Sequence, residues 1–155
     1  MPVKHASRLL ALAVAGCGLS ACAMVGPETS YVEPLASPTD SSVLAGGISY
    51  FMLSRFPPGS TSISLDPPLA GQESNELTPV LAATLQSRGF RVSTTGPAAP
   101  GAHTLRYWIT PLDASGELVR LMIDGNVACS RFYVRNTGGG LQSGGPFTVT
   151  RETSL

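Results

Sequence analysis

The chain has 155 residues, with ten basic and ten acidic side chains, so its formal net charge at pH 7 is zero. This length predicts one domain together with some segments outside it. The charges are spread without a basic cluster, which leaves direct nucleic-acid binding without electrostatic support.

The N-terminus has the order of parts of a secretory signal. Lys4 and Arg8 supply a positive start, and residues 9–19 form an apolar run without a charge. Two small residues, the second of them Ala21, then precede Cys22. A cysteine at this position is typical of a bacterial lipoprotein signal. We therefore expect cleavage after Ala21 and a diacylglycerol on the Cys22 thiol.

Other interpretations of residues 1–21 are weaker. The apolar run of about 11 residues is much shorter than the ~20 that a transmembrane helix needs. Gly16 and Gly18 disfavour a buried core helix. Cleavage before Cys17 is a rival, but it would leave an apolar segment of only about seven residues.

A lipid anchor would determine where the protein works. Two long acyl chains contribute on the order of 20 kcal/mol at ~0.8 kcal/mol per buried methylene, which is effectively permanent anchoring. Ala23 stands where aspartate would signal retention in the inner membrane. By analogy with other lipoproteins, we expect the outer membrane, with the domain in the periplasm.

Residues 22–37 are predicted to form the lipidated N-terminus and a flexible tether. They contain Gly26, Pro27 and Pro34 and few large apolar side chains. A single α+β domain is expected over residues 38–152.

The segment from Ser37 to Asp40 has the features of a helix start. Ser37 can cap the helix, Pro38 suits its first position, and Asp40 favours the positive end of the helix dipole. An apolar stripe follows at helical spacing: Leu44, Ile48, Phe51, Met52 and Phe56. The helix should end at residues 57–59, which read Pro-Pro-Gly.

A second helix is predicted over about 75–88. Its leucines recur every four residues, at Leu77, Leu81 and Leu85. Pro79 is tolerable because it falls in the first turn. Gly89 suits the left-handed position after the helix, and Phe90 can fold back on the last turn.

The remaining chain is rich in strand patterns. Strands are expected over 61–65, 91–95, 103–110, 117–123, 127–134 and 147–151. Residues 124–126, Asp-Gly-Asn, predict a tight hairpin turn in which Gly and Asn take positive φ. Because only the two helices carry apolar stripes that can cover a sheet, the fold class is α+β. We expect a small two-layer domain with two helices packed on a mainly antiparallel sheet.

The sequence offers no constellation for catalysis. His103 is the one histidine after the leader, and no Ser-His-Asp grouping or Gly-x-Ser-x-Gly motif accompanies it. Glu73 and Glu76 are interpreted as surface groups that stabilise the second helix rather than as a hydrolytic pair. No metal-ligand spacing occurs. We predict a protein that is not an enzyme and has no cofactor and no small-molecule substrate.

Cys129 is the cysteine that remains after cleavage and acylation, so a disulfide framework within one chain is not expected. Its apolar strand context favours a small buried side chain. The alternative is a disulfide to a partner subunit in the oxidising periplasm.

Aromatic and arginine side chains are the candidates for partner contacts, since these residue types dominate interface energetics. They are Trp108, Arg131, Tyr133 and Arg135. The competing interpretation is that Trp108 and Tyr133 pack in or beside the sheet. An exposed edge strand is a further route to a partner.

Several motifs together resemble one known family. The lipoprotein signal and tether precede a helix that ends in Arg-Phe-Pro-Pro at 55–58. Residues 77–90 read Leu-x-x-x-Leu-x-x-x-Leu-x-x-Arg-Gly-Phe, followed by Leu-Arg-Tyr at 105–107 and Ser-Arg-Phe-Tyr-Val at 130–134. In this order they resemble the TrbH family of conjugal transfer lipoproteins.

The resemblance implies a role in the mating-pair formation apparatus, a type IV secretion system that moves plasmid DNA between bacteria. It implies a lipid-anchored structural subunit that contacts other core-complex subunits, with Cys22 as the functional position that carries over. At the level of fold analogy it also implies similarity to the small N-terminal domains of secretins. The alternative function is a free-standing outer-membrane lipoprotein that acts as a binding module or a surface or entry exclusion factor.

Overall fold

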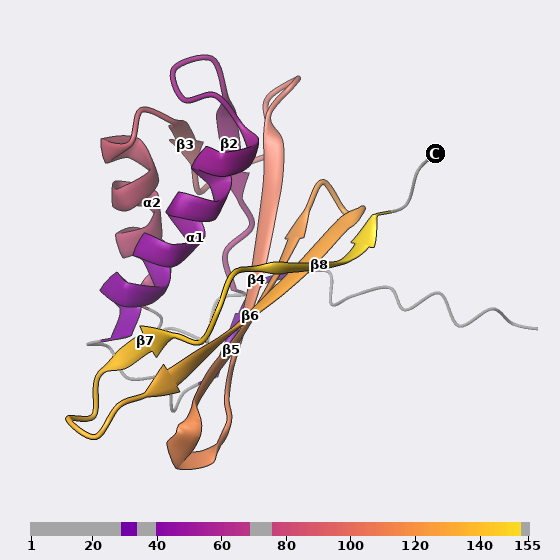
Figure 1. Ribbon diagram of the computed structural model, residues 1–155. Helices are drawn as coiled ribbons and strands as arrows, with labels where there is room; N and C mark the ends of the chain where they lie inside the picture. Colours follow the sequence, from indigo (N-terminus) through magenta and orange to yellow (C-terminus); the bar gives the residue numbers. More distant parts are fainter. Residues whose placement is uncertain (1–28, 34–39, 69–75, 153–155) are drawn as a thin grey trace, which may run out of the picture.

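The computed structural model describes residues 29–33, 40–68 and 76–152. These residues form two α-helices that lie side by side on one side of a single eight-stranded sheet (Figure 1). Neither helix combines the length and apolarity needed to traverse a bilayer. The predicted leader with Ala21, the lipid site Cys22, and the residues Ser37, Pro38 and Glu73 lie outside the described residues.

Helix α1 spans Ser41–Arg55 and packs on the sheet through the predicted stripe. Leu44, Ile48 and Met52 are buried, whereas Phe51 and Phe56 are half-buried against the core. The described helix begins at Ser41. Asp40 occupies the N-cap position but makes no cap hydrogen bond, because its carboxylate pairs with Arg135 instead.

Helix α2 spans Leu77–Ser87 and ends as the sequence predicts. Gly89 takes a φ of 93°, and its N–H donates to the carbonyl of Gln86 at 2.9 Å. The N–H of Phe90 donates to the carbonyl of Leu85 at 3.2 Å, and both side chains are buried. This pair of bonds is a Schellman motif with its hydrophobic contact.

The sheet has the order β3-β2-β4-β5-β6-β7, with β1 paired to β4 and β8 paired to β6. Strands β1, β2, β3 and β4 pair in parallel, and the pairings from β4 onward through β5, β6, β7 and β8 are antiparallel. The bounds are β1 Tyr31–Val32, β2 Ser62–Leu65, β3 Arg91–Ser93, β4 His103–Pro111, β5 Gly116–Ile123, β6 Val127–Arg135, β7 Leu141–Ser143 and β8 Thr148–Glu152. The predicted α+β class and mainly antiparallel sheet are confirmed.

Three local features differ from the sequence-based expectations. Tyr31–Val32, inside the predicted tether, form β1 along the edge of β4, because that edge offers free backbone groups. Leu141–Ser143 form β7 within the glycine-rich segment, since Leu141 is buried in the core. In the hairpin turn, positive φ falls on Asp124 and Gly125 rather than on Asn126.

The core lies between the two helices and the sheet. Alternation along β4 places Leu105, Tyr107 and Ile109 in this core, where all three are fully buried. Trp108 points to the other face and is not part of the core cluster. The helix-covered face therefore builds the fold, and neither helix of the described residues lies on the opposite face (Figure 1).

Candidate functional site

The structure brings Arg131 and Tyr133 together but places Trp108 apart from them, on the other face of the sheet. Trp108 lies on the face away from the helices, where it is 8% exposed. Tyr133 and Arg131 lie on β6 and point toward the helices, in register with Glu117 and Val119 of β5. Tyr133 is 1% exposed and belongs to the core cluster, so its position agrees with the packing interpretation.

Tyr133 sits directly beneath helix α1 at Gly47. A Cβ atom on Gly47 would lie 1.8 Å from the Tyr133 hydroxyl oxygen, so only glycine permits this approach. Burial raises the pKa of Tyr133, with Arg131 opposing the shift. The side chain is therefore neutral and serves as a spacer between helix and sheet.

Arg131 links β6 to the segment before β8 through its guanidinium group. Its Cζ lies 5.1 Å from the ring centre of Tyr133 and 5.3 Å from that of Phe147. Phe147 in turn packs on Phe51 of α1, with ring centres 4.6 Å apart. Cation–π contacts of this kind are worth ~0.5–2 kcal/mol, so Arg131 fixes the segment before β8 against α1.

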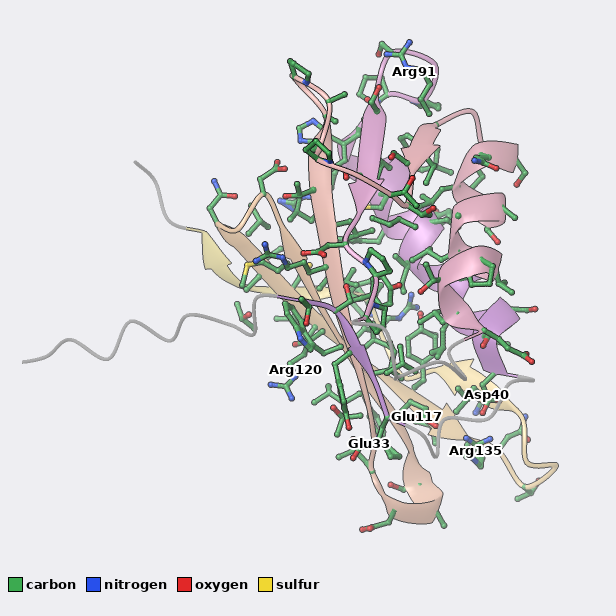
Figure 2. All side chains as sticks on the ribbon, turned by 180° about the vertical axis from the view of Figure 1, so that it is seen from behind. Glu33, Asp40, Arg91, Glu117, Arg120 and Arg135 are labelled. Atoms are coloured by element: carbon green, nitrogen blue, oxygen red, sulfur yellow. The ribbon has the colours of Figure 1, made fainter. Side chains whose placement is uncertain are left out.

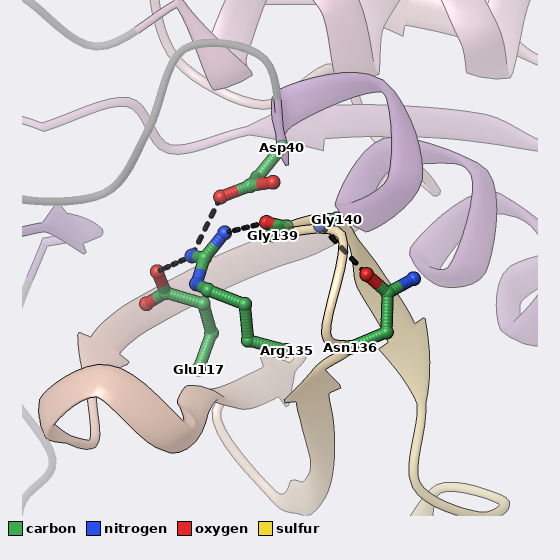
Figure 3. Close-up of polar contacts among 6 residues, drawn as sticks. All are labelled: Asp40, Glu117, Arg135, Asn136, Gly139 and Gly140. Carbon is green, nitrogen blue, oxygen red and sulfur yellow. Dashed lines mark hydrogen bonds and ion pairs between the residues drawn. The ribbon is translucent and has the colours of Figure 1, made fainter.

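A buried charged cluster connects the start of α1 to the end of the sheet (Figure 3). Arg135 Nη2 donates to Asp40 Oδ2 at 2.8 Å and to Glu117 Oε1 at 3.3 Å, and Nη1 donates to the Gly139 carbonyl at 2.6 Å. The side chains of Asp40 and Glu117 are only 4% and 2% exposed. Desolvation raises the pKa of Glu117; Arg135 opposes this shift, while the carboxylates of Asp40 and Glu33 add to it.

His103 has a structural setting of its own. Its Nδ1 lies 2.7 Å from Asp124 Oδ2, and its ring centre lies 4.1 Å from that of Phe56. Asp124 also accepts a hydrogen bond from the Thr104 N–H at 2.8 Å. The pair thus ties the start of β4 to the hairpin turn and to the end of α1. Among the described residues, no group of three or more His, Cys, Asp or Glu side chains could hold a metal ion.

Cys129 points into the core and is 1% exposed. Burial raises the pKa of its thiol to about 11, so the thiol stays protonated at physiological pH. Its position is that of the small buried side chain that the sequence favours, and a partner's thiol has no access to it in this fold.

The face of the sheet away from the helices carries a band of apolar side chains around one arginine. Strand register places Trp108 opposite Arg120, and Leu118 opposite Phe132. Arg120 is exposed and points away from the helices (Figure 2). We call this surface the open face: Tyr31, Trp108, Leu118, Arg120, Met122, Phe132 and Val134.

Sequence reasoning found only part of these sites. The alternation along β4 predicts that Trp108 lies on the opposite side of the strand from Tyr107. Sequence reasoning did not identify Arg120 or Phe132, although the same alternation along β5 and β6 contains that signal. The partners of Arg135 gave no signal, because Asp40 and Glu117 are remote from it in the chain.

Comparison with known proteins gives one match. The family model described as "Conjugal transfer protein TrbH" matches residues 25–153, which include every element of the described fold. No curated protein and no solved structure matches the chain. The family resemblance in the sequence is therefore confirmed, and the analogy with secretin N-terminal domains stays a prediction.

Proposed function

We propose, from the premise that this chain belongs to the TrbH family of conjugal transfer proteins, that it is a lipid-anchored structural subunit of a conjugative type IV secretion system. In this role it supports mating-pair formation and plasmid DNA transfer. The observation that carries the proposal is the family match, because it spans the whole described domain rather than one motif.

The proposed anchor is a diacylglycerol on the Cys22 thiol, and cleavage behind Ala21 would make Cys22 the new N-terminus. The first strand begins at Tyr31. A fully extended chain from Cys22 to that strand reaches roughly 30 Å, at 3.3–3.6 Å per residue. An anchored domain would therefore stay close to the outer membrane on its periplasmic side, within reach of other envelope subunits.

A structural role fits the way in which the domain uses its polar groups. Arg135, Asp40 and Glu117 hold the start of α1 to the sheet, and His103 is held by Asp124 and Phe56. These groups stabilise contacts between elements, which is what a rigid subunit of an assembly needs. The TrbH family is described by conjugal transfer and not by a reaction.

Deletion of the gene from a donor strain tests the proposal. We expect plasmid transfer to fall to background and to return with the wild-type gene, and we expect the protein to copurify with the channel subunits. Cys22→Ser is the matched variant for the anchor and should release the domain from the membrane fraction. Normal transfer after deletion, with a changed recipient phenotype, would favour the alternative function of an exclusion factor.

A further inference from the structure

The open face has the composition of a docking surface rather than of a solvated sheet face. Leu118, Met122, Phe132 and Val134 are half-buried and lie outside the core cluster, and Gly144 of the segment after β7 lies beside Phe132 and Val134. Trp108 is nine-tenths buried on the same face, and its indole N–H has no hydrogen-bond partner within the part of the chain that the structure describes. Partly exposed apolar side chains that gather on one sheet face are typical of an interaction site.

The charges on this face determine what it can bind. On β4, β5 and β6 the positions that point away from the helices include Arg106 and Arg120 but no Asp or Glu. Arg106 is neutralised by Asp66, with Nε 2.7 Å from Oδ2. Arg120 stands between Trp108 and Ser130 in the strand register. It has no ion-pair partner among the described residues.

A partner that covers the apolar band must also cover Arg120, because the arginine stands among those side chains. Taking an unpaired cation out of water is costly unless the partner supplies an opposite charge in hydrogen-bonding geometry. A second copy that docked its own open face would offer Arg120 no Asp or Glu from the outward positions of β4, β5 or β6. Self-association through this face is therefore disfavoured.

We infer that the open face binds a partner protein through a segment that presents an Asp or Glu side chain among apolar side chains, with the carboxylate on Arg120. Trp and Arg are also the residue types that most often dominate binding energy at interfaces. The inference rests on the proposed function in one respect: the partner is expected to be another subunit of the transfer apparatus.

Photo-crosslinking in donor cells tests the inference with the full-length protein. A photo-reactive amino acid at position 118 reports on the open face, and the same amino acid at position 88, at the exposed end of α2, is the control. We expect a protein adduct from position 118 and none from position 88. The crosslinked peptide should contain Asp or Glu among apolar residues.

Charge reversal then tests the arginine itself. Arg120→Glu should lower both the adduct yield and the transfer frequency by roughly tenfold or more, the equivalent of about 1.4 kcal/mol. Arg120→Lys should retain most of both, and Arg88→Glu should change neither. Replacing the acidic residue of the crosslinked peptide by Arg should restore the adduct and the transfer of Arg120→Glu.

Several outcomes would overturn the inference. They are equal adduct yields for Arg120→Glu and Arg88→Glu, a crosslink from position 118 to a second copy or to lipid, and failure of the reversed charge to rescue. Unfolding midpoints of Arg120→Glu and Arg120→Ala show whether a loss comes from misfolding. Failure of the proposed function can be told apart from failure of this inference. If the proposed function is wrong, gene deletion leaves plasmid transfer normal, whatever position 118 crosslinks to.

Discussion

The two faces of one sheet differ in what covers their side chains and in how their charges are partnered. On the helix-covered face, Tyr133 is in the core, and the buried carboxylates of Asp40 and Glu117 share Arg135. On the open face, the neighbouring Phe132 is half-buried, and Arg120 is exposed without an ion-pair partner among the described residues. The comparison teaches that the covered face supplies the stability of the fold, while the open face is available for binding.

Adjacent residues on β6 provide the strongest test of this difference. Tyr133→Ala should lower the free energy of unfolding by ~3–5 kcal/mol, because it removes a fully buried aromatic side chain. Phe132→Ala should lower it by only about 1 kcal/mol, because the side chain is half-buried and outside the core. Urea unfolding measures both values, and equal losses would remove the distinction between the faces.

Breaking the ion pair on the helix-covered face should cost more unfolding free energy than breaking the one on the open face. Arg135→Met leaves two buried carboxylates without a partner and should cost about 3 kcal/mol of unfolding free energy. Arg106→Met breaks a pair with Asp66 in which both side chains are 35% exposed, and should cost less than ~1 kcal/mol. Thermal unfolding of the two variants gives the comparison, and a larger loss for Arg106→Met would contradict it.

Two neighbouring glycines of α1 have different surroundings. Gly47 lies against Tyr133 of the sheet, whereas Gly46 has open space around it. Gly47→Ala should destabilise by about 2 kcal/mol, since its Cβ would overlap the Tyr133 hydroxyl. A Cβ atom on Gly46 would meet nothing within 4 Å. Gly46→Ala should therefore stabilise the folded state by ~0.5–1 kcal/mol through helix propensity. Adding Tyr133→Phe to Gly47→Ala should restore part of the loss, and no recovery would argue against this contact.

The smallest expected effect concerns pH. Because burial raises the pKa of Glu117, the folded state holds its proton more tightly than the unfolded state. This contribution to stability is present below the ordinary glutamate pKa and is lost as pH rises through the raised value. Wild type should therefore lose stability relative to Glu117→Gln as pH rises from about 4.5 toward neutrality. Urea midpoints across this range measure it, and a pH-independent difference would contradict it.

Local signals explain which parts of the fold the sequence predicts. The end of α2 was predictable because Gly89 and Phe90 act on their own last turn, and β4 because its alternation is long. Strand β1 was not predictable, because two residues carry no periodic signal and its pairing depends on the edge of β4. Asp40 was assigned to the helix dipole because its actual partner, Arg135, is far away in the chain.

The open face was likewise predictable from the sequence only where a local signal exists. The alternation along β4 separates Trp108 from Tyr107, but only the packed helices show which of the two faces they leave uncovered. Tyr133 and Arg131 were predicted as partner contacts, and both lie beneath or beside α1, where Gly47 and Phe147 meet them. Their role in partner binding stays a prediction that the structure does not require.

The transfer frequency of donors that carry Phe132→Ala tests the central claim most directly. Purified Phe132→Ala should unfold cooperatively, close to the wild-type midpoint, and the variant should reach wild-type levels in the membrane fraction. Plasmid transfer by these donors should nevertheless fall by roughly tenfold, since a truncated aromatic side chain at an interface costs more than 1 kcal/mol of binding. Wild-type transfer frequency at equal protein level would contradict the claim that the open face is the working surface of this protein.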